Sequence, residues 1–265
     1  MTTAYGSFAA RRTRTRNPTV RQIGIADLMD AIAKGLRDFN EMPTHLFYLA
    51  LIYPVVTFAV VTFYGQLDLL PLIFPLLAGY TLVGPIVAVG TYELSRRREF
   101  GRFTSRTNAF LVFKSRSIVP IMGLSAVLAF IYLVWLTAAG AIYIQYFAGI
   151  GPESYIGFVA QVLTTPQGWG MFVTGSAVGL IMAVIVLSLS VVSFPMVLDL
   201  DVDVFTALKT SVSAVAANPV VMAVWGVIVA VSLIVGSLPL LTGLCVVLPV
   251  LGHATWHLYR KIVES

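Results

Sequence analysis

Long uncharged stretches alternate along this chain with short blocks of basic residues. Six stretches contain no Lys, Arg, Asp or Glu, and each is long enough for a helix to cross the hydrocarbon core of a bilayer, which needs roughly 20 residues and more if the helix is tilted. They run approximately over residues 46–65, 69–92, 118–148, 171–198, 220–236 and 238–258. The pattern therefore predicts an all-α membrane protein with about six transmembrane helices.

A shorter apolar periodicity precedes the first stretch. Apolar side chains recur there at spacings of three and four, at Ile25, Leu28, Met29, Ile32, Leu36 and Phe39. Charged residues take the other directions, at Asp27, Asp30, Lys34, Arg37 and Asp38. This predicts an amphipathic helix that lies in the cytoplasmic interface of the membrane. The alternative is that its apolar stripe packs on the ends of the protein's own helices, and the sequence fits both.

Part of this segment recurs later in the chain. Ala31-Ile32, Gly35, Phe39 and Pro43 match, in register, the residues Ala207-Leu208, Ser211, Val215 and Pro219. Each copy precedes a pair of apolar stretches. A second interfacial helix is therefore expected after residue 203, and one interpretation is a repeated unit of interfacial helix plus helical hairpin, used two or three times.

The basic residues indicate how the chain is oriented. All seventeen Lys and Arg lie in the N-terminal segment, in residues 95–117, at Lys209, or in the C-terminal tail. With six spans these four regions share one face, which the positive-inside rule makes cytoplasmic, together with both termini. Residues 1–18 contain no apolar run after their arginines, so we expect a disordered basic tail rather than a signal peptide. Residues 19–265 then form a single transmembrane domain.

Composition supports this class and narrows the partners. The chain is 58% hydrophobic and 11% charged, with a mean hydropathy of +0.90, which is unlike a water-soluble domain. The formal charge of +5 is explained by topology, so nucleic acid is not an expected partner. Membrane lipids, other membrane proteins or a second copy are expected instead. The single cysteine, Cys245, provides no disulfide.

Five polar residues form the candidate site, because they lie where the even-numbered spans are expected to end on the cytoplasmic side. They are Glu93, Asp199, Asp203, His253 and His257. Ionisable groups at the edge of a membrane span are a reason to look for function. No catalytic residue, no cofactor and no metal site is predicted, and the chain is not expected to be an enzyme.

Two features of these residues have alternative interpretations. His253 and His257 stand four apart on one helix face, which suits a metal or haem, but such a pair also serves to anchor a helix end. Asp201 or Asp203 is expected to cap the second interfacial helix. Prolines inside the spans, such as Pro85 and Pro249, could line a transport path or simply bend the helices.

Three segments resemble a known family. They are Val192-Ser193-Phe194-Pro195-Met196-Val197-Leu198-Asp199, the stretch from Asp201-Val202-Asp203 to Pro219, and the closing Leu248-Pro249-Val250-Leu251-Gly252-His253-Ala254-Thr255-Trp256-His257-Leu258-Tyr259-Arg260. The chain resembles the bacterial integral membrane proteins of domain of unknown function 2189 over nearly everything after the basic tail, most specifically in the closing segment. The resemblance implies a six-helix protein of the inner membrane with no established activity.

Three functional hypotheses remain open at this point. The first is a non-catalytic protein that associates with lipid or other membrane proteins. The second is a small-molecule or ion transporter or channel. The third is a metal- or haem-binding membrane protein that uses His253 and His257.

Overall fold

The fold is described from a computed structural model, which covers residues 18–42, 44, 48, 70–148, 154–200, 202–238 and 241–264. The helices are α1 (Ile25–Glu41), α3 (Leu70–Glu99), the 3-10 helix η2 (Arg106–Lys114), α4 (Ile118–Phe147), α5 (Tyr155–Thr164), α6 (Pro166–Ser190), α7 (Ser193–Asp199), α8 (Val204–Ala217), α9 (Pro219–Ser237) and α10 (Leu244–Ile262). Two short strands, β1 (Thr19–Val20) and β2 (Val263–Glu264), pair antiparallel and join the two ends of the described chain.

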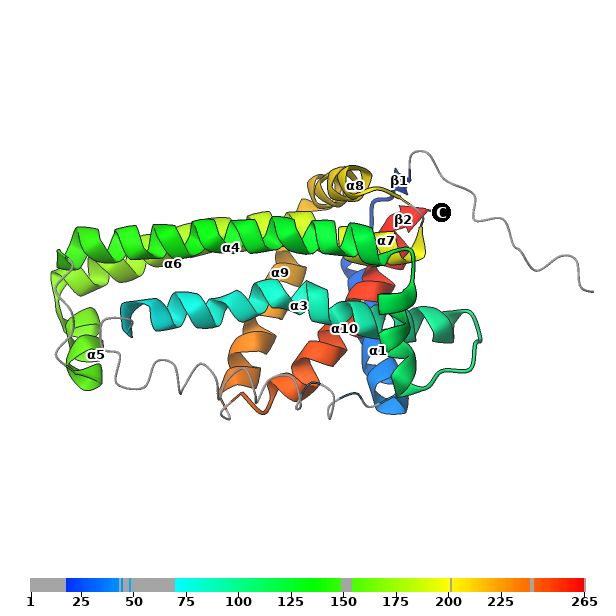
Figure 1. The fold of residues 1–265 in the computed structure, drawn as a ribbon, viewed down its shortest axis with the longest axis horizontal. Coiled ribbons are helices and arrows are strands. Elements are labelled where there is room, and N and C mark those ends of the chain that lie inside the picture. Colours follow the sequence, from blue (N-terminus) through cyan, green and yellow to red (C-terminus); the bar gives the residue numbers. More distant parts are fainter. Residues whose placement is uncertain are drawn as a thin grey trace, which may run out of the picture.

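Helices α3, α4 and α6 run along the long axis of the molecule, and α5 lies at the far end of the α4–α6 hairpin (Figure 1). The hairpin is closely packed where side chains are small: a β-carbon placed on Gly179 of α6 would lie 3.3 Å from the ring of Trp135 on α4. The Tyr146 hydroxyl also lies 2.8 Å from that of Thr174 across the same pair. These long helices extend away from the end of the molecule where the polar residues gather.

Among the described residues, three helical segments are long and apolar enough to cross a membrane: Ile118–Phe147, Pro166–Asp199 and Pro219–Ser237. They correspond to the predicted spans 118–148, 171–198 and 220–236. The predicted span 69–92 corresponds to the first part of α3, which begins at Leu70 and continues to Glu99. The predicted span 46–65 lies outside the described residues apart from Tyr48. The structure therefore supports an all-α membrane protein and does not show six spans.

The fourth predicted span differs from its expected form at both ends. Helix α6 begins five residues early, at Pro166, because the Thr165 hydroxyl accepts a hydrogen bond from the Gly168 amide at 3.0 Å and proline is well suited to the first helical position. Near its other end the helix is interrupted before α7. Pro195 explains the interruption, because a proline cannot donate to the carbonyl four residues earlier and its ring clashes with it.

The sixth predicted span, 238–258, is not confirmed by the structure. Helix α10 begins only at Leu244, and it is not among the helices that qualify as spans. Its second half carries His253, His257 and Arg260, and most of that half is buried inside the protein. An apolar pattern does not by itself distinguish the two cases, because a helix buried against other helices is as apolar as one that faces lipid.

Helices are present at both segments that were predicted to be interfacial, as α1 and α8, and α1 runs across the direction of α4 and α6 (Figure 1). In α1 the apolar stripe divides into two neighbouring faces. Leu28, Ala31 and Gly35 are buried, whereas Ile25, Met29 and Leu36 are exposed. Packing on the protein's own helices thus accounts for one half of the stripe, and the other half is open at the surface.

Matching positions of the two interfacial helices have matching environments. Ala31 and Ala207 are both fully buried, as are Gly35 and Ser211. The first helix of the hairpin that would follow α1 lies outside the described residues apart from Tyr48, so the repeated unit stays a prediction.

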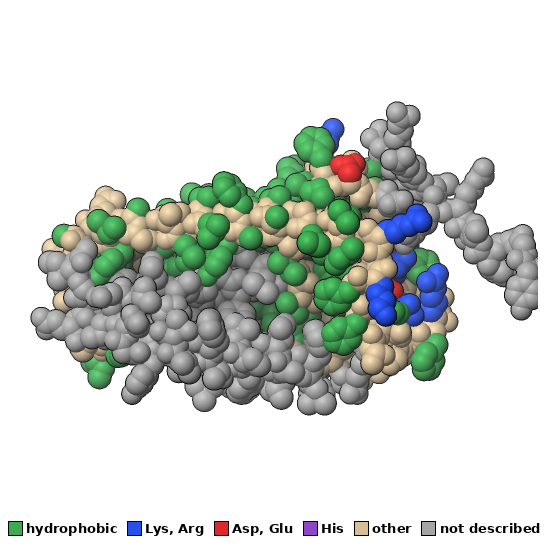
Figure 2. Space-filling view, in the orientation of Figure 1, with side chains coloured by type: hydrophobic (Ala, Val, Ile, Leu, Met, Phe, Trp, Pro, Cys, Tyr) green, Lys and Arg blue, Asp and Glu red, His purple; other side chains and the backbone are tan. Residues whose placement is uncertain are grey.

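The densest core lies at one end of the molecule, where α1, α7 and α10 meet. Its largest fully buried side chains include Trp256, Tyr259, Phe194 and Leu28. By contrast, only 22% of the most apolar stretch of α4 is buried, and 28% of that in α6 and α7. Figure 2 shows apolar side chains spread along the long helices and basic side chains at the end that holds the core.

Candidate functional site

Polar side chains from α1, α3, α7 and α10 converge at the end of the molecule that holds the core. Close packing of α1 on α10 makes this possible, because a β-carbon on Gly35 would lie 2.6 Å from the backbone nitrogen of Ala254. Helices α3 and α10 approach in the same way, with Gly252 directly facing the side chain of Thr91. Glycine at these two positions lets three helix backbones come near enough for short polar side chains to meet.

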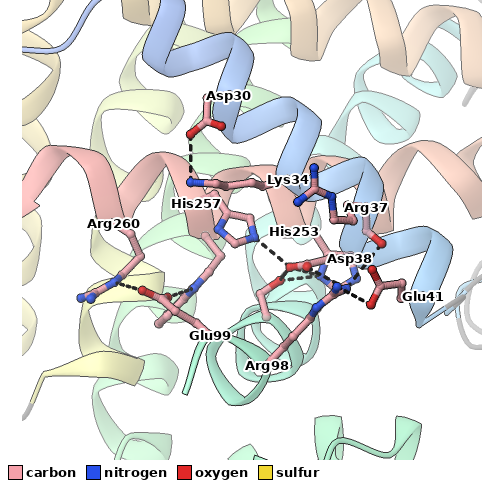
Figure 3. Close-up of polar contacts among 12 residues, drawn as sticks. Asp30, Lys34, Arg37, Asp38, Glu41, Arg98, Glu99, His253, His257 and Arg260 are labelled. Carbon is pink, nitrogen blue, oxygen red and sulfur yellow. Dashed lines mark hydrogen bonds and ion pairs between the residues drawn. The ribbon is translucent and has the colours of Figure 1, made fainter. Parts of the chain in front are cut away.

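Asp38 of α1 is at the centre of the first network (Figure 3). Its Oδ2 accepts hydrogen bonds from Ser95 Oγ at 2.5 Å and from His257 Nε2 at 2.8 Å. Its Oδ1 pairs with Arg98 Nη1 at 3.1 Å, and Arg98 also pairs with Glu41. His253 Nδ1 lies 2.7 Å from Ser95 Oγ and 4.0 Å from Asp38 Oδ2. One carboxylate thereby joins three helices.

The hydrogen bonds fix where the protons lie in this network. Burial by itself would raise the pKa of Asp38, but the hydrogen bonds from His257 and Ser95 and the neighbouring histidines hold it below its ordinary value. Asp38 is therefore ionised and takes the only hydroxyl proton of Ser95. His253 must then donate from Nδ1 to the Ser95 oxygen. Its Nε2 carries a lone pair, is buried, and has no hydrogen-bond partner among the described residues.

Serine, histidine and aspartate thus meet here, but not in the order that nucleophilic catalysis needs. In a catalytic triad the histidine lies between the other two, with its ring accepting the serine proton and the carboxylate holding the opposite ring nitrogen. Here Ser95 lies between Asp38 and His253, and it gives its proton to the carboxylate. Ser95 is also completely buried. The arrangement joins helices, and its serine is not exposed as a nucleophile.

Glu93 and Asp199 belong to a second network on the other side of α3. Glu93 pairs with Arg96 at 2.9 Å and with Arg97 at 2.8 Å, one oxygen to each. Asp199, at the end of α7, accepts from the Tyr259 hydroxyl at 3.0 Å and pairs with Arg260 at 3.2 Å. Arg96 lies 3.5 Å from the second oxygen of Asp199 and so connects the two carboxylates.

Glu99 extends this second network along α10. It accepts from the indole of Trp256 at 2.9 Å and from Arg260 at 3.0 Å. Because Arg260 also binds Asp199, the last turn of α10 is held to both α3 and α7. Figure 3 shows Glu99 and Arg260 beside the Asp38 network.

Asp203 is separate from both networks. It caps α8, where its carboxylate accepts from the Thr206 amide at 3.0 Å and from the Thr206 hydroxyl at 2.7 Å. These bonds lower the pKa of Asp203, as expected for a carboxylate at a helix N-terminus. The capping prediction is confirmed for this residue. Asp201 lies outside the described residues.

Of the five candidate residues, the structure therefore places His253 and His257 together, Glu93 and Asp199 together, and Asp203 elsewhere. Within the described part of the chain, no group of three His, Cys, Asp or Glu side chains is arranged to hold a metal ion. His257 reaches the Asp38 carboxylate at hydrogen-bond distance, which leaves no room for an ion between the two groups.

Sequence reasoning missed Asp38, Ser95 and Arg98. It assigned Asp38 to the polar side of the amphipathic helix, and that assignment is wrong: Asp38 is 5% exposed and lies on the buried face. A signal was present, because Asp38 follows Leu28, Ala31 and Gly35 at the spacing of one helix face. A charged residue in that register indicates a buried partner, but not which one.

Comparison with known proteins found one family whose model matches part of the chain. Residues 73–199 match the family described as "Predicted integral membrane protein (DUF2189)". This confirms the resemblance over residues 73–199. The DUF2189 match begins within α3 and ends at Asp199, so it includes the α4–α6 hairpin and α7. The closing segment of α10, which carries much of the resemblance, lies beyond it. No curated protein and no solved structure matches the chain.

Proposed function

We propose that this chain is a non-catalytic, multi-pass protein of the bacterial inner membrane that acts by associating with lipid or with other membrane proteins. In this proposal both termini and the network-bearing end lie on the cytoplasmic side. The observation that carries it is the apolar flank of α4 and α6, where large side chains such as Phe130, Leu133 and Leu180 are each more than 60% exposed.

The dimensions of the hairpin support a membrane position. Helix α4 has 30 residues, which corresponds to about 45 Å, more than the roughly 30 Å of the hydrocarbon core. Its ends would therefore reach the headgroups on both sides. Exposing this surface to water would cost about 1.5–3 kcal/mol for each fully exposed large side chain. Contact of the hairpin with lipid or with another apolar partner avoids this cost.

The polar networks support a role without chemistry. Their carboxylates are bound by side chains of the same protein: Glu93 by two arginines, Asp199 by Arg260 and Tyr259, and Asp38 by Ser95, His257 and Arg98. The pairs of Asp199 and Asp38 join different helices, and those of Glu93 lie within α3. The orientation is supported by the basic residues, which lie in the last turn of α3, before α4 and in the last turn of α10.

The test is purification from the native membrane in a mild detergent, followed by mass spectrometry of the lipids and proteins that remain bound. We expect a reproducible set of bound lipids or membrane proteins in fixed ratio to the chain. Purified protein reconstituted in liposomes should release trapped ions and small solutes no faster than empty liposomes. Solute flux that depends on the protein, a Soret band or stoichiometric metal would overturn the proposal.

A further inference from the structure

The connection between α3 and α4, residues 100–117, exposes an unusual number of phenylalanines. We call it the phenylalanine loop. Phe100, Phe103, Phe110 and Phe113 are 52%, 88%, 52% and 69% exposed. Phe110 and Phe113 stack on each other with ring centroids 6.4 Å apart. Positive charge in this loop follows from topology, but topology does not require four exposed aromatic rings.

The rings are exposed although the loop is well packed. Val112 of η2 is buried, and Ala109 lies against Gly90 of α3. Ser105 and Asn108 close the start of η2, with the Ser105 amide donating to the Asn108 side chain at 2.7 Å. At its end the Ser115 hydroxyl donates to the Val112 carbonyl at 2.7 Å. The loop is thus held with Val112 inward and Phe110 and Phe113 outward.

Basic side chains are interleaved with the exposed rings. Arg102, Lys114 and Arg116 are all exposed, and residues 100–117 contain no Asp or Glu. The guanidinium of Arg102 lies over the Phe100 ring, 5.9 Å from its centre. Apolar rings beside exposed positive charge are the combination that binds at the boundary between acyl chains and anionic headgroups.

The position of the loop fits that boundary. It leads directly into α4, and exposed apolar side chains continue from the loop onto the first turns of α4 at Val119 and Met122. Since α4 is longer than the hydrocarbon core, its first turn falls at headgroup level. The rings of the phenylalanine loop therefore begin where the membrane-facing surface of α4 begins.

We propose that the phenylalanine loop inserts its rings into the cytoplasmic leaflet and binds the headgroups of anionic phospholipids through Arg102, Lys114 and Arg116. This inference rests on the proposed membrane function and names its lipid class and its site. The loop would act as an anchor that selects phosphatidylglycerol-like headgroups over zwitterionic ones. A second copy of the chain is the competing occupant of the same rings.

The first experiment measures depth in the bilayer. A spin label is attached at Phe113→Cys in a Cys245→Ser background, and the protein is placed in nanodiscs of phosphatidylcholine with or without one third phosphatidylglycerol. We expect the label to be more accessible to oxygen than to a water-soluble nickel complex, and more so with phosphatidylglycerol. A label that is as accessible to nickel as one at the exposed Lys209 would overturn the inference.

A label at Phe130→Cys separates this inference from the function on which it rests. If Phe130 lies in the hydrocarbon core while Phe113 lies in water, the anchor is wrong and the membrane assignment stands. If both lie in water, the membrane assignment itself is wrong. Strong dipolar coupling between labels at position 113 in two protein molecules would also overturn the inference, since it would assign the rings to an interface between copies.

The second experiment removes the charges and keeps the rings. The variant Lys114→Gln/Arg116→Gln should reduce the enrichment of phosphatidylglycerol in the purified protein by roughly an order of magnitude. The matched control is Arg37→Gln/Lys209→Gln, which changes net charge equally at two exposed positions outside the loop. Equal losses in the two variants would show that lipid selection follows overall charge, and the assignment to the loop would fail.

Discussion

Asp38 and Asp30 lie two turns apart on α1 and differ chiefly in burial. Asp30 pairs with Lys34 and Lys261 at 2.9 Å each, yet its side chain is 44% exposed. Asp38 makes contacts of similar length with a side chain that is 6% exposed. Water screens the first set of charges and not the second, so residues with similar contacts contribute differently to stability.

We predict that Asp38→Ala destabilises the protein by about 3–5 kcal/mol, because it leaves Ser95 and His257 without their carboxylate acceptor inside the protein and removes one of the two carboxylates that pair with Arg98. The matched control, Asp30→Ala, should cost less than about 1 kcal/mol. Thermal unfolding in detergent, followed by tryptophan fluorescence, measures both variants. Equal shifts in the unfolding midpoint would contradict the buried role of Asp38.

Replacing Asp38 should also change how the stability of the protein depends on pH. The folded-state pKa of Asp38 lies below its ordinary value, so its contribution is complete above the unfolded pKa of about 3.9 and is lost as pH falls through the lower, folded pKa. In Asp38→Asn this acid-dependent part should be missing. The measurement is the unfolding midpoint of wild type and variant from pH 7 down to pH 3, where the difference between them should shrink.

At the scale of the element, contacts between helices depend on where glycine allows close approach. Gly35 brings α1 against the backbone of α10, whereas a β-carbon on Gly140, two turns before the end of α4, would have no described atom of another element within 4 Å. The two residues are equally helical and chemically identical. Only the neighbouring helix distinguishes them.

We predict opposite results for the same substitution at these positions. Gly35→Ala should destabilise the protein by about 1–3 kcal/mol, because the obstacle is backbone, which moves only if the two helices separate. Gly140→Ala should be neutral or stabilising by up to about 1 kcal/mol, because alanine is the better helix former. Hydrogen exchange of α1 provides a second readout, and it should rise only in Gly35→Ala. Unchanged exchange there would contradict the close packing.

The whole molecule has two unlike ends. One end holds the core, both polar networks and the paired strands, and the other consists of the apolar α4–α6 hairpin with α5 (Figures 1 and 2). The proposed orientation places the first end in the cytoplasm. This orientation can be tested without knowing which lipid or protein the chain binds.

We expect single cysteines at the two ends to react from opposite sides of the membrane. In a Cys245→Ser background, Ser154→Cys before α5 should react with a membrane-impermeant maleimide in intact spheroplasts. Lys209→Cys on α8 should react only after lysis. The reverse pattern would invert the orientation, and labelling of both positions in intact spheroplasts would contradict the transmembrane hairpin.

The sequence was sufficient to predict an all-α membrane protein, helices at the positions of α1, α4, α8 and α9, and a carboxylate cap at the start of α8. These depend on local properties: apolar length, helix periodicity and a side chain that bonds its own backbone. Each of these properties depends only on residues that are close together in the chain, so the sequence alone specifies them.

Only the tertiary structure decided which polar residues meet. Asp38, Ser95 and His253 are far apart in the chain, and they are brought together because glycines let α1, α3 and α10 touch. The same packing buried the second half of α10, whose pattern had predicted a membrane span. Apolar residues look alike whether lipid or protein covers them, and for that reason the boundary between span and core could not be read from the sequence.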